Sequence, residues 1–347
     1  MIKPRDLKVI YINPAGGCNL HCRHCWVNEG GTASETMSLK SWTALLDEAV
    51  VMGCSSIKYT GGEPLLYPEF VELYRYSGNL FQTVMIETNG TLRPKGFFEA
   101  LEDFPPLQVS VSLDSAKEES HDQFRGKKGA WRNSVFFIEE LVSRGLNNQV
   151  IMSVSVMERQ PVLDMIALIE RIGAGSLKIN FITPVGRGAK DSFYEDLDIK
   201  EALEYFRWLT TETPQWVLPS LPAALVPADR LAGVGYCPVR NLIGVLPDGT
   251  FSLCGVAFSR PEMAWGRYPE VSLSDAWARS PVLTEIRNKL PDDLEYPCSM
   301  CIHKTSCIGR CIVNNYETSG SLFASDLFCK KAMNEGLFPE TRLIRSE

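Results

Sequence analysis

Three cysteines near the N-terminus form the most chemically informative group in the sequence. Cys18, Cys22 and Cys25 are separated by three and then two residues, directly after a β-like run at 9–13. A [4Fe–4S] cluster needs a ligand at each of its irons, so three cysteines leave one iron open to another ligand. Two other interpretations remain: a zinc site completed by a distant residue, or thiols that serve only in packing.

A second candidate site is the run Gly61-Gly62-Glu63-Pro64. Two glycines let backbone groups approach a ligand closely, because no Cβ stands in the way. Glu63 adds an anionic acceptor, so the loop suits an ammonium group held by a carboxylate and backbone carbonyls. The alternative is an ordinary Gly-Gly turn with a solvated glutamate.

The C-terminal third contains a second group of cysteines. Thiols in a reducing compartment favour metal ligation over disulfides. A zinc ribbon would show two Cys-x2-Cys pairs, whereas only Cys298 and Cys301 have this spacing. Only Cys54 lies outside both groups of cysteines, and we expect it to be a small buried hydrophobe. The C-terminal group is Cys237, Cys254, Cys298, Cys301, Cys307, Cys311 and Cys329.

The composition excludes several classes of function. The net charge of −7 and the absence of clustered Lys and Arg argue against nucleic-acid binding. No run approaches the roughly 18 apolar residues of a membrane span, and the N-terminus lacks the apolar region of a signal peptide. We therefore expect a cytoplasmic protein with no membrane partner. A hydrophobic fraction of 45% over 347 residues can bury a sizeable core.

Strands and helices are predicted to alternate through the first half of the chain. Strict alternation predicts a parallel sheet, because each return to the same edge needs a crossover helix. The predicted strands are 9–12, 56–60, 83–87, 107–113, 150–156 and 177–182. The predicted helices are 38–52, 68–76, 95–102, 131–144 and 161–172, followed by a helical stretch at 197–211.

Six such units form either a partial barrel or an open doubly wound sheet, and periodicity does not decide between them. In both, sites gather at the carboxyl ends of the strands. The cysteine loop, Gly61–Pro64 and Thr88–Gly90 all fall there. We expect the following residues to face the same rim, without assigning a catalytic acid or base: Tyr59, Glu87, Asp114 and Arg187.

The predicted domain division follows a change in amino-acid composition along the chain. Beyond Asp191 the prolines at 214, 219, 222 and 227 interrupt regular structure, and seven cysteines follow. We predict a barrel domain at 1–190, a connecting region at 191–236 and a cysteine-rich domain at 237–347.

The order of these motifs resembles the radical S-adenosylmethionine (radical SAM) enzymes. The resemblance implies a partial (β/α)6 barrel in which Cys18, Cys22 and Cys25 hold a [4Fe–4S] cluster and SAM chelates the open iron. Reductive cleavage of SAM would yield a 5′-deoxyadenosyl radical that abstracts hydrogen from a substrate. The resemblance also implies a SAM pocket formed by His24 near the adenine, Gly61, Gly62 and Glu63 at the ammonium, Thr88, Asn89 and Ser112 as lining, and Arg125 at the carboxylate.

The C-terminal cysteines resemble the SPASM extension of that family, which carries two auxiliary iron–sulfur clusters. By this resemblance a distal cluster, expected to be [4Fe–4S], takes Cys298, Cys301, Cys307 and Cys329. The proximal cluster takes Cys237, Cys254 and Cys311. With three cysteines it needs a non-cysteine ligand, keeps an open iron, or is a [2Fe–2S] cluster.

The resemblance implies an oxidoreductase that modifies a ribosomally synthesised peptide by cross-linking, thioether formation, epimerisation or dehydrogenation. The implied partners are a peptide, an electron donor such as flavodoxin or ferredoxin, and a separate leader-binding protein. Because the first strand begins near Lys8, we expect peptide recognition at the barrel mouth, in the 191–236 connection or by another protein. The alternatives are a small-molecule dehydrogenase or epimerase, a maturase of another enzyme, and a non-catalytic electron carrier.

Overall fold

The computed structural model describes residues 7–26, 35–182, 184–190, 197–235, 237–255 and 260–344. The strands in these residues are β1 (Val9–Ile12), β2 (Ser56–Tyr59), β3 (Thr83–Thr88), β4 (Gln108–Ser112), β5 (Asn148–Val154), β6 (Leu177–Phe181), β7 (Val217–Pro219), β8 (Leu242–Val245), β9 (Thr250–Ser252) and β10 (Ala264–Arg267). They form one sheet in the order β10-β9-β8-β1-β2-β3-β4-β5-β6-β7.

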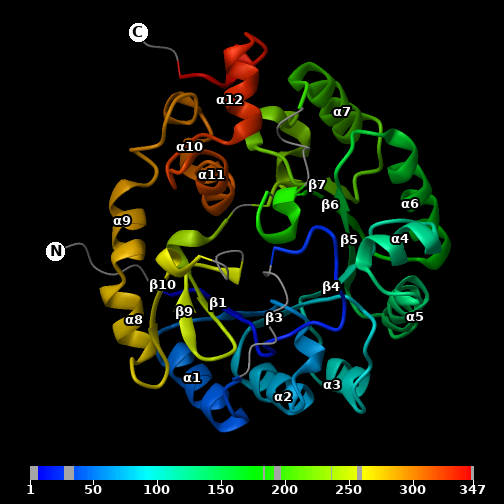
Figure 1. Ribbon diagram of the computed structural model, residues 1–347, viewed down its shortest axis with the longest axis vertical. Helices are drawn as coiled ribbons and strands as arrows, with labels where there is room; N and C mark the ends of the chain where they lie inside the picture. The colour runs from blue at the N-terminus through cyan, green and yellow to red at the C-terminus, as the bar shows by residue number, and fades with distance from the viewer. Residues whose placement is uncertain are drawn as a thin grey trace.

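The sheet is a curved, open barrel. Strands β8 to β7 pair in parallel along this order, and β9 and β10 continue it in antiparallel fashion. Helices surround its outer face (Figure 1). The α/β fold, the partial barrel and the six predicted strands are confirmed. Strands β7 and β8, which the sequence did not predict, extend the six at either end.

The helices that cover the barrel follow the predicted alternation, with one additional helix at Glu118–Arg125 that was not predicted. They are α1 (Leu39–Val51), α2 (Phe70–Leu80), α3 (Phe97–Asp103), α4 (Glu118–Arg125), α5 (Ala130–Ser143), α6 (Arg159–Ile172) and α7 (Ile199–Thr211). In α1 the Ser38 side chain caps the first turn by accepting from the Ser41 N–H at 3.2 Å. Its buried face carries Trp42 and Leu45, which have no exposed surface.

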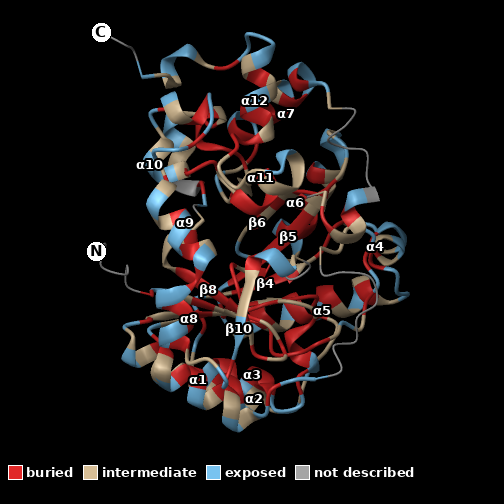
Figure 2. Cartoon of the chain, turned by 60° about the vertical axis from the view of Figure 1, so that its left-hand side comes forward, coloured by how far each residue is buried: buried red, intermediate tan, exposed pale blue. Residues whose placement is uncertain are grey.

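Alternate residues of each strand point to opposite faces of the sheet. Ile57 of β2 and Ile86 of β3 are fully buried and belong to the core beneath the helices. Figure 2 shows that buried residues are concentrated along the strands and on the helix faces that turn toward them. Their neighbours Lys58 and Glu87 face the concave side and are partly exposed. The barrel therefore has an apolar exterior under its helices and a polar interior.

This alternation corrects one prediction. Tyr59 is not at the rim: it has no exposed surface, and its ring lies 5.1 Å from that of Phe70 on α2. Lys58 and Thr60 take the concave face in its place. The prediction failed because the loop after β2 begins at Thr60, so Tyr59 still follows the pleat of the strand.

The C-terminal region continues the same sheet. Strand β8 pairs with β1, with Val9 opposite Leu242. Phe251 and Leu273 belong to the same buried core as the barrel. The helices here are α8 (Leu273–Arg279), α9 (Pro281–Lys289), α10 (Lys304–Cys307), α11 (Ile312–Ser319) and α12 (Leu327–Asn334).

The predicted domain division stays a prediction. Its first boundary falls at 191–196 and its second at Tyr236, both outside the described residues. Cys54 is 4% exposed, as expected of a buried small hydrophobe. Among the described residues, none of the helices has the length and apolar character needed to cross a membrane.

Candidate functional site

One cavity at the carboxyl ends of the barrel strands gathers the residues singled out in the first half of the sequence. All the residues assigned to the N-terminal cluster or to SAM line it except Glu63. The lining residues among them are Cys18, Cys22, His24, Cys25, Gly61, Gly62, Thr88, Asn89, Ser112 and Arg125. Tyr59 and Asp114, which were expected at the rim, do not line it. The three cysteines follow β1, and the others come from the ends of β2, β3 and β4 and from α4.

The cysteine loop is fixed from two sides. Its His21 and Arg23 N–H groups donate to the last turn of α4, at 3.1 Å to Arg125 O and 2.9 Å to Phe124 O. On the other side the Glu63 N–H donates to Gly17 O at 3.0 Å. Gly62 lies so close that an added Cβ would stand 2.2 Å from the same oxygen. The two glycine-containing loops therefore position each other.

A third contact holds the last cysteine from the far side of the barrel. After β6, the Arg187 N–H donates to Cys25 O at 2.9 Å, and its guanidinium donates to Cys22 O at 2.8 Å. A Cβ at Gly186, whose φ is +58°, would lie 2.5 Å from Cys25 O. The expectation that Arg187 lies at the rim is confirmed. There its hydrogen bonds hold the cysteine loop in place.

Two of the thiols receive hydrogen bonds that suit sulfur bearing negative charge. Arg125 donates to Cys22 Sγ at 3.5 Å, and Asn89 Nδ2 donates to Cys18 Sγ at 3.8 Å. Burial raises the pKa of Cys18 to about 11, so the free thiol is neutral at pH 7. The donors around these thiols fit a cofactor that binds thiolate.

Arg125 is itself held by Asp114. Its Nε donates to Asp114 Oδ2, and Ser153 N donates to Asp114 Oδ1 at 3.0 Å. Burial alone would raise the pKa of Asp114, but the Arg125 guanidinium, together with His24 and His121, more than offsets burial, so the pKa is lowered. Asp114 is thus a buried carboxylate that orients Arg125 toward Cys22.

The carboxylate of Glu63 does not reach the cavity. It is fully buried and accepts from Thr88 Oγ1 at 2.7 Å, Asn89 N at 2.8 Å and Leu65 N at 3.1 Å. Burial raises its pKa to about 7 despite these donors. In this geometry Glu63 ties the Gly61–Pro64 loop to the end of β3. Its assignment to an ammonium group stays a prediction.

His24 supplies a flat wall of the cavity. Its ring stacks on Phe124 with centroids 4.6 Å apart and planes 14° apart. Burial lowers the pKa of His24 to about 4, so the ring is neutral at pH 7. A neutral, stacked imidazole offers a surface on which an aromatic base could lie.

The C-terminal cysteines fall into the two predicted sets. Those assigned to the distal cluster, Cys298, Cys301, Cys307 and Cys329, line one cavity. Cys254 and Cys311 lie close enough to Cys237 to add to the rise in its pKa, which burial mainly causes. Across the described residues, His, Cys, Asp and Glu side chains nowhere gather in threes around a point for a single metal ion. A cluster takes each thiolate at a different iron, so its ligands need not meet at a point.

Glu87, which was expected at the rim, lines the cavity and forms an ion pair with Lys58, while Thr60 Oγ1 donates to its second oxygen at 2.9 Å. Sequence reasoning missed the other polar side chains inside the barrel, among them Lys58 and Thr60. Ser153 and Asn180 line the cavity from β5 and β6. Within the strands, polar residues alternate with apolar ones, and this alternation could have indicated which side chains face the barrel interior.

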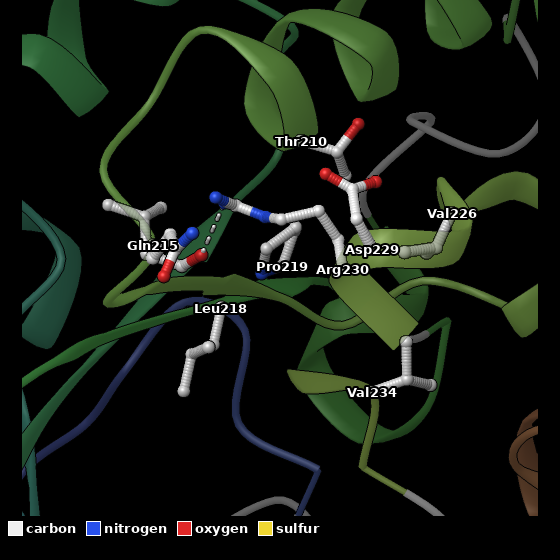
Figure 3. Close-up of a pocket in the computed structure, with 9 residues that line it drawn as sticks. Thr210, Gln215, Leu218, Pro219, Val226, Asp229, Arg230 and Val234 are labelled. Carbon is white, nitrogen blue, oxygen red and sulfur yellow. Dashed lines mark hydrogen bonds between the residues drawn. The ribbon is translucent and has the colours of Figure 1, made fainter. Parts of the chain in front are cut away.

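A separate cavity lies beside β7, in the 191–236 connection. Thr210, Leu218, Asp229 and Arg230 line it (Figure 3), and none of the predicted site residues does. Strand β7 cannot accept a further strand here. Pro219 has no N–H, the Val217 N–H donates to Pro214 O at 3.0 Å, and Arg230 donates to Val217 O at 3.5 Å.

The comparison with protein families decides which class of enzyme this site represents. Residues 12–172 match the model of the Radical SAM superfamily. Residues 12–172 therefore form a radical SAM domain. The match contains the cysteine loop, Gly61–Pro64 and Arg125, and the cysteine-rich C-terminal region follows it, as in SPASM-type radical SAM enzymes.

Several relatives match most of the length of the chain. It is 25% identical over 338 residues to the AdoMet-dependent heme synthase of Methanosarcina barkeri, covering 90% of this chain and 93% of that protein. It is 26% identical over 325 residues to the mycofactocin maturase MftC of Mycobacterium tuberculosis, covering 92% and 81%. The structure of Streptococcus suis SuiB bound to precursor peptide SuiA shares the fold, with a TM-score of 0.71 at 16% identity, covering 92% and 75%.

Proposed function

We propose that this radical SAM enzyme binds a [4Fe–4S] cluster at Cys18, Cys22 and Cys25, and SAM in the adjoining cavity. The observation that carries the proposal is that these three thiols line one cavity together with Gly61, Gly62 and the other residues assigned to SAM. When bound, the reduced cluster and SAM supply a 5′-deoxyadenosyl radical that abstracts hydrogen from a substrate.

The residues of the chain have distinct tasks in this proposal. Arg125 stabilises negative charge at Cys22, and Asp114 fixes its orientation. The neutral ring of His24 lies against the adenine. Glu63 keeps the glycine loop against the cysteine loop, so that backbone groups of Gly61 and Gly62 face the methionine part of SAM.

We further propose two auxiliary clusters. A distal one at Cys298, Cys301, Cys307 and Cys329 is supported by their common cavity. A proximal one at Cys237, Cys254 and Cys311 is supported by their mutual proximity. In the same proposal, the 191–236 connection or a separate leader-binding protein recognises the peptide. An external donor such as flavodoxin or ferredoxin supplies the electron that reduces the cluster.

The proposed substrate is a peptide, which the enzyme oxidises or cross-links. The support is likeness to a mycofactocin maturase along most of the chain and the fold shared with SuiB, whose structure contains a precursor peptide. A small-molecule substrate is the second candidate, because relatives of similar coverage are heme synthases. Incubation with candidate peptides, followed by a search for the loss of two mass units, distinguishes the two.

The central test is anaerobic reduction of the reconstituted enzyme with SAM. We expect 5′-deoxyadenosine and methionine as products. Cys22→Ala should abolish them while leaving the iron bound by the C-terminal cysteines. Cys54→Ala is the matched control, because it removes a buried thiol that belongs to none of the three proposed clusters. It should retain both SAM cleavage and the iron bound by the C-terminal cysteines. Cleavage by Cys22→Ala at the wild-type rate would overturn the proposal.

A further inference from the structure

The barrel interior contains three charged side chains that the proposed function does not use. Lys58 of β2, Glu87 of β3 and Lys178 of β6 occupy concave positions of their strands. The negative charge of Glu87 acts to raise the pKa of both lysines. Two positive groups therefore share one negative group in a space largely shielded from water.

The negative group is already engaged. Lys58 Nζ forms an ion pair with Glu87 Oε1, and Thr60 donates to Glu87 Oε2. The Lys58 ammonium also lies 5.0 Å from the centre of the Tyr11 ring. Lys58 is thus neutralised and held in place from two sides.

Lys178 has no such partner. No hydrogen bond or ion pair joins its ammonium to another described residue. Besides Lys58, the positive charge that acts on Lys178 is Arg310, which forms an ion pair with Asp326 at 3.1 Å. Burial lowers the pKa of Lys178, and the charge of Glu87 only partly opposes this effect. The interior consequently holds one positive charge in excess.

The position of Lys178 is at the level of the SAM cavity. In the register of β5 and β6 it stands beside Ile151, which in turn stands beside Ser112 on β4. Both Ile151 and Ser112 line the cavity, as does Asn180, the next concave residue of β6. A group bound at Lys178 would therefore lie beside the proposed SAM pocket.

We propose that Lys178 binds a carboxylate of the substrate inside the barrel. This inference rests on the proposed function, because it assigns the chemistry of the substrate of that same site. Buried charges are normally paired, and an unpaired ammonium is stabilised by an anion of equal charge. A single excess charge suits a carboxylate, and Asn180, on the same face of β6, supplies a neutral polar group beside it. A peptide would present a Glu, an Asp or its C-terminal carboxylate.

The test uses two peptide-like probes that differ only in charge: N-acetyl-glutamate N-methylamide and the corresponding glutamine compound. Their dissociation constants are measured by ligand-observed NMR on the reconstituted enzyme with SAM. We expect the wild type to bind the glutamate probe about 10- to 100-fold more tightly, as for a hydrogen bond between charged groups. Lys178→Met should abolish this preference, and Lys95→Met, which changes an exposed lysine, should preserve it.

A second variant distinguishes loss of the site from loss of the fold. Glu87→Gln frees Lys58 from its counterion, so the preference for the glutamate probe should increase. Equal affinity of the wild type for both probes, including no measurable binding of either, would overturn the proposal, as would a preference that survives Lys178→Met. Formation of 5′-deoxyadenosine without probe is measured in parallel. Its absence in the wild type refutes the proposed function, while the comparison of probes still decides the role of Lys178.

Discussion

The contact between Gly62 and the cysteine loop gives a sharp test of how the site is assembled. In Gly62→Ala the new Cβ would lie 2.2 Å from Gly17 O and 2.8 Å from Gly17 C. Ordinary contacts begin at 3.4 Å, so the backbone beside Cys18 must move by about 1 Å. Overpacking of this kind costs about 1–3 kcal/mol. Weakening the hydrogen bond from Glu63 N to Gly17 O adds about 0.5–1.5 kcal/mol.

We therefore expect Gly62→Ala to lower the free energy of unfolding by about 2–4 kcal/mol. The measurement is urea unfolding of the protein without clusters, which separates the packing effect from cofactor binding. Gly17→Ala is the matched control, because a Cβ there meets no atom within 4 Å. It should change stability by less than about 1 kcal/mol. If both variants unfold at the same urea concentration, the two loops do not position each other as described.

Three further predictions concern the core, a buried acid and the distal cysteines. Phe70→Ala should cost about 3–5 kcal/mol in urea unfolding, because its fully buried ring meets three other aromatic rings of the core, whereas half-exposed Phe136→Ala should cost less than about 1 kcal/mol. The pKa of Glu63 in the folded protein is raised to about 7, so the stability it contributes is present at pH 4 and is lost as the pH rises to 7. Glu63→Gln should remove this decline, and unchanged pH dependence of unfolding would contradict it. Cys329→Ala should lower the iron content of the reconstituted enzyme by about four atoms per chain, and full iron content would argue against the distal assignment.

Much of the fold was predictable because its pattern is local. Each of the first six strands is a short β-rich run bounded by turn residues, and helical periodicity is clear in segments such as Leu39–Val51. The same alternation placed the cysteine loop and Gly61–Pro64 at one rim, and all but one of the predicted SAM residues share one cavity.

The failures arise where local pattern and tertiary environment differ. Helix α4 was missed because Glu118–Arg125 has few apolar residues, and the side chains it buries are His121 and Arg125. Strand β8 is four residues long, and its parallel partner β1 lies at the other end of the chain. The burial of the Glu63 carboxylate also could not be predicted, since its donors come from Leu65 and from the end of β3.

The pairing of β8 with β1 has a consequence for synthesis of the protein on the ribosome. Strand β1 is made before the partner for its outer edge, which begins at Leu242, about 230 residues later in the chain. At about 5–20 residues per second this delay is roughly 10–50 s. During that interval the nascent barrel exposes an unpaired parallel edge next to the cysteine loop. Chaperone dependence of the yield should therefore be greatest for chains arrested before residue 242.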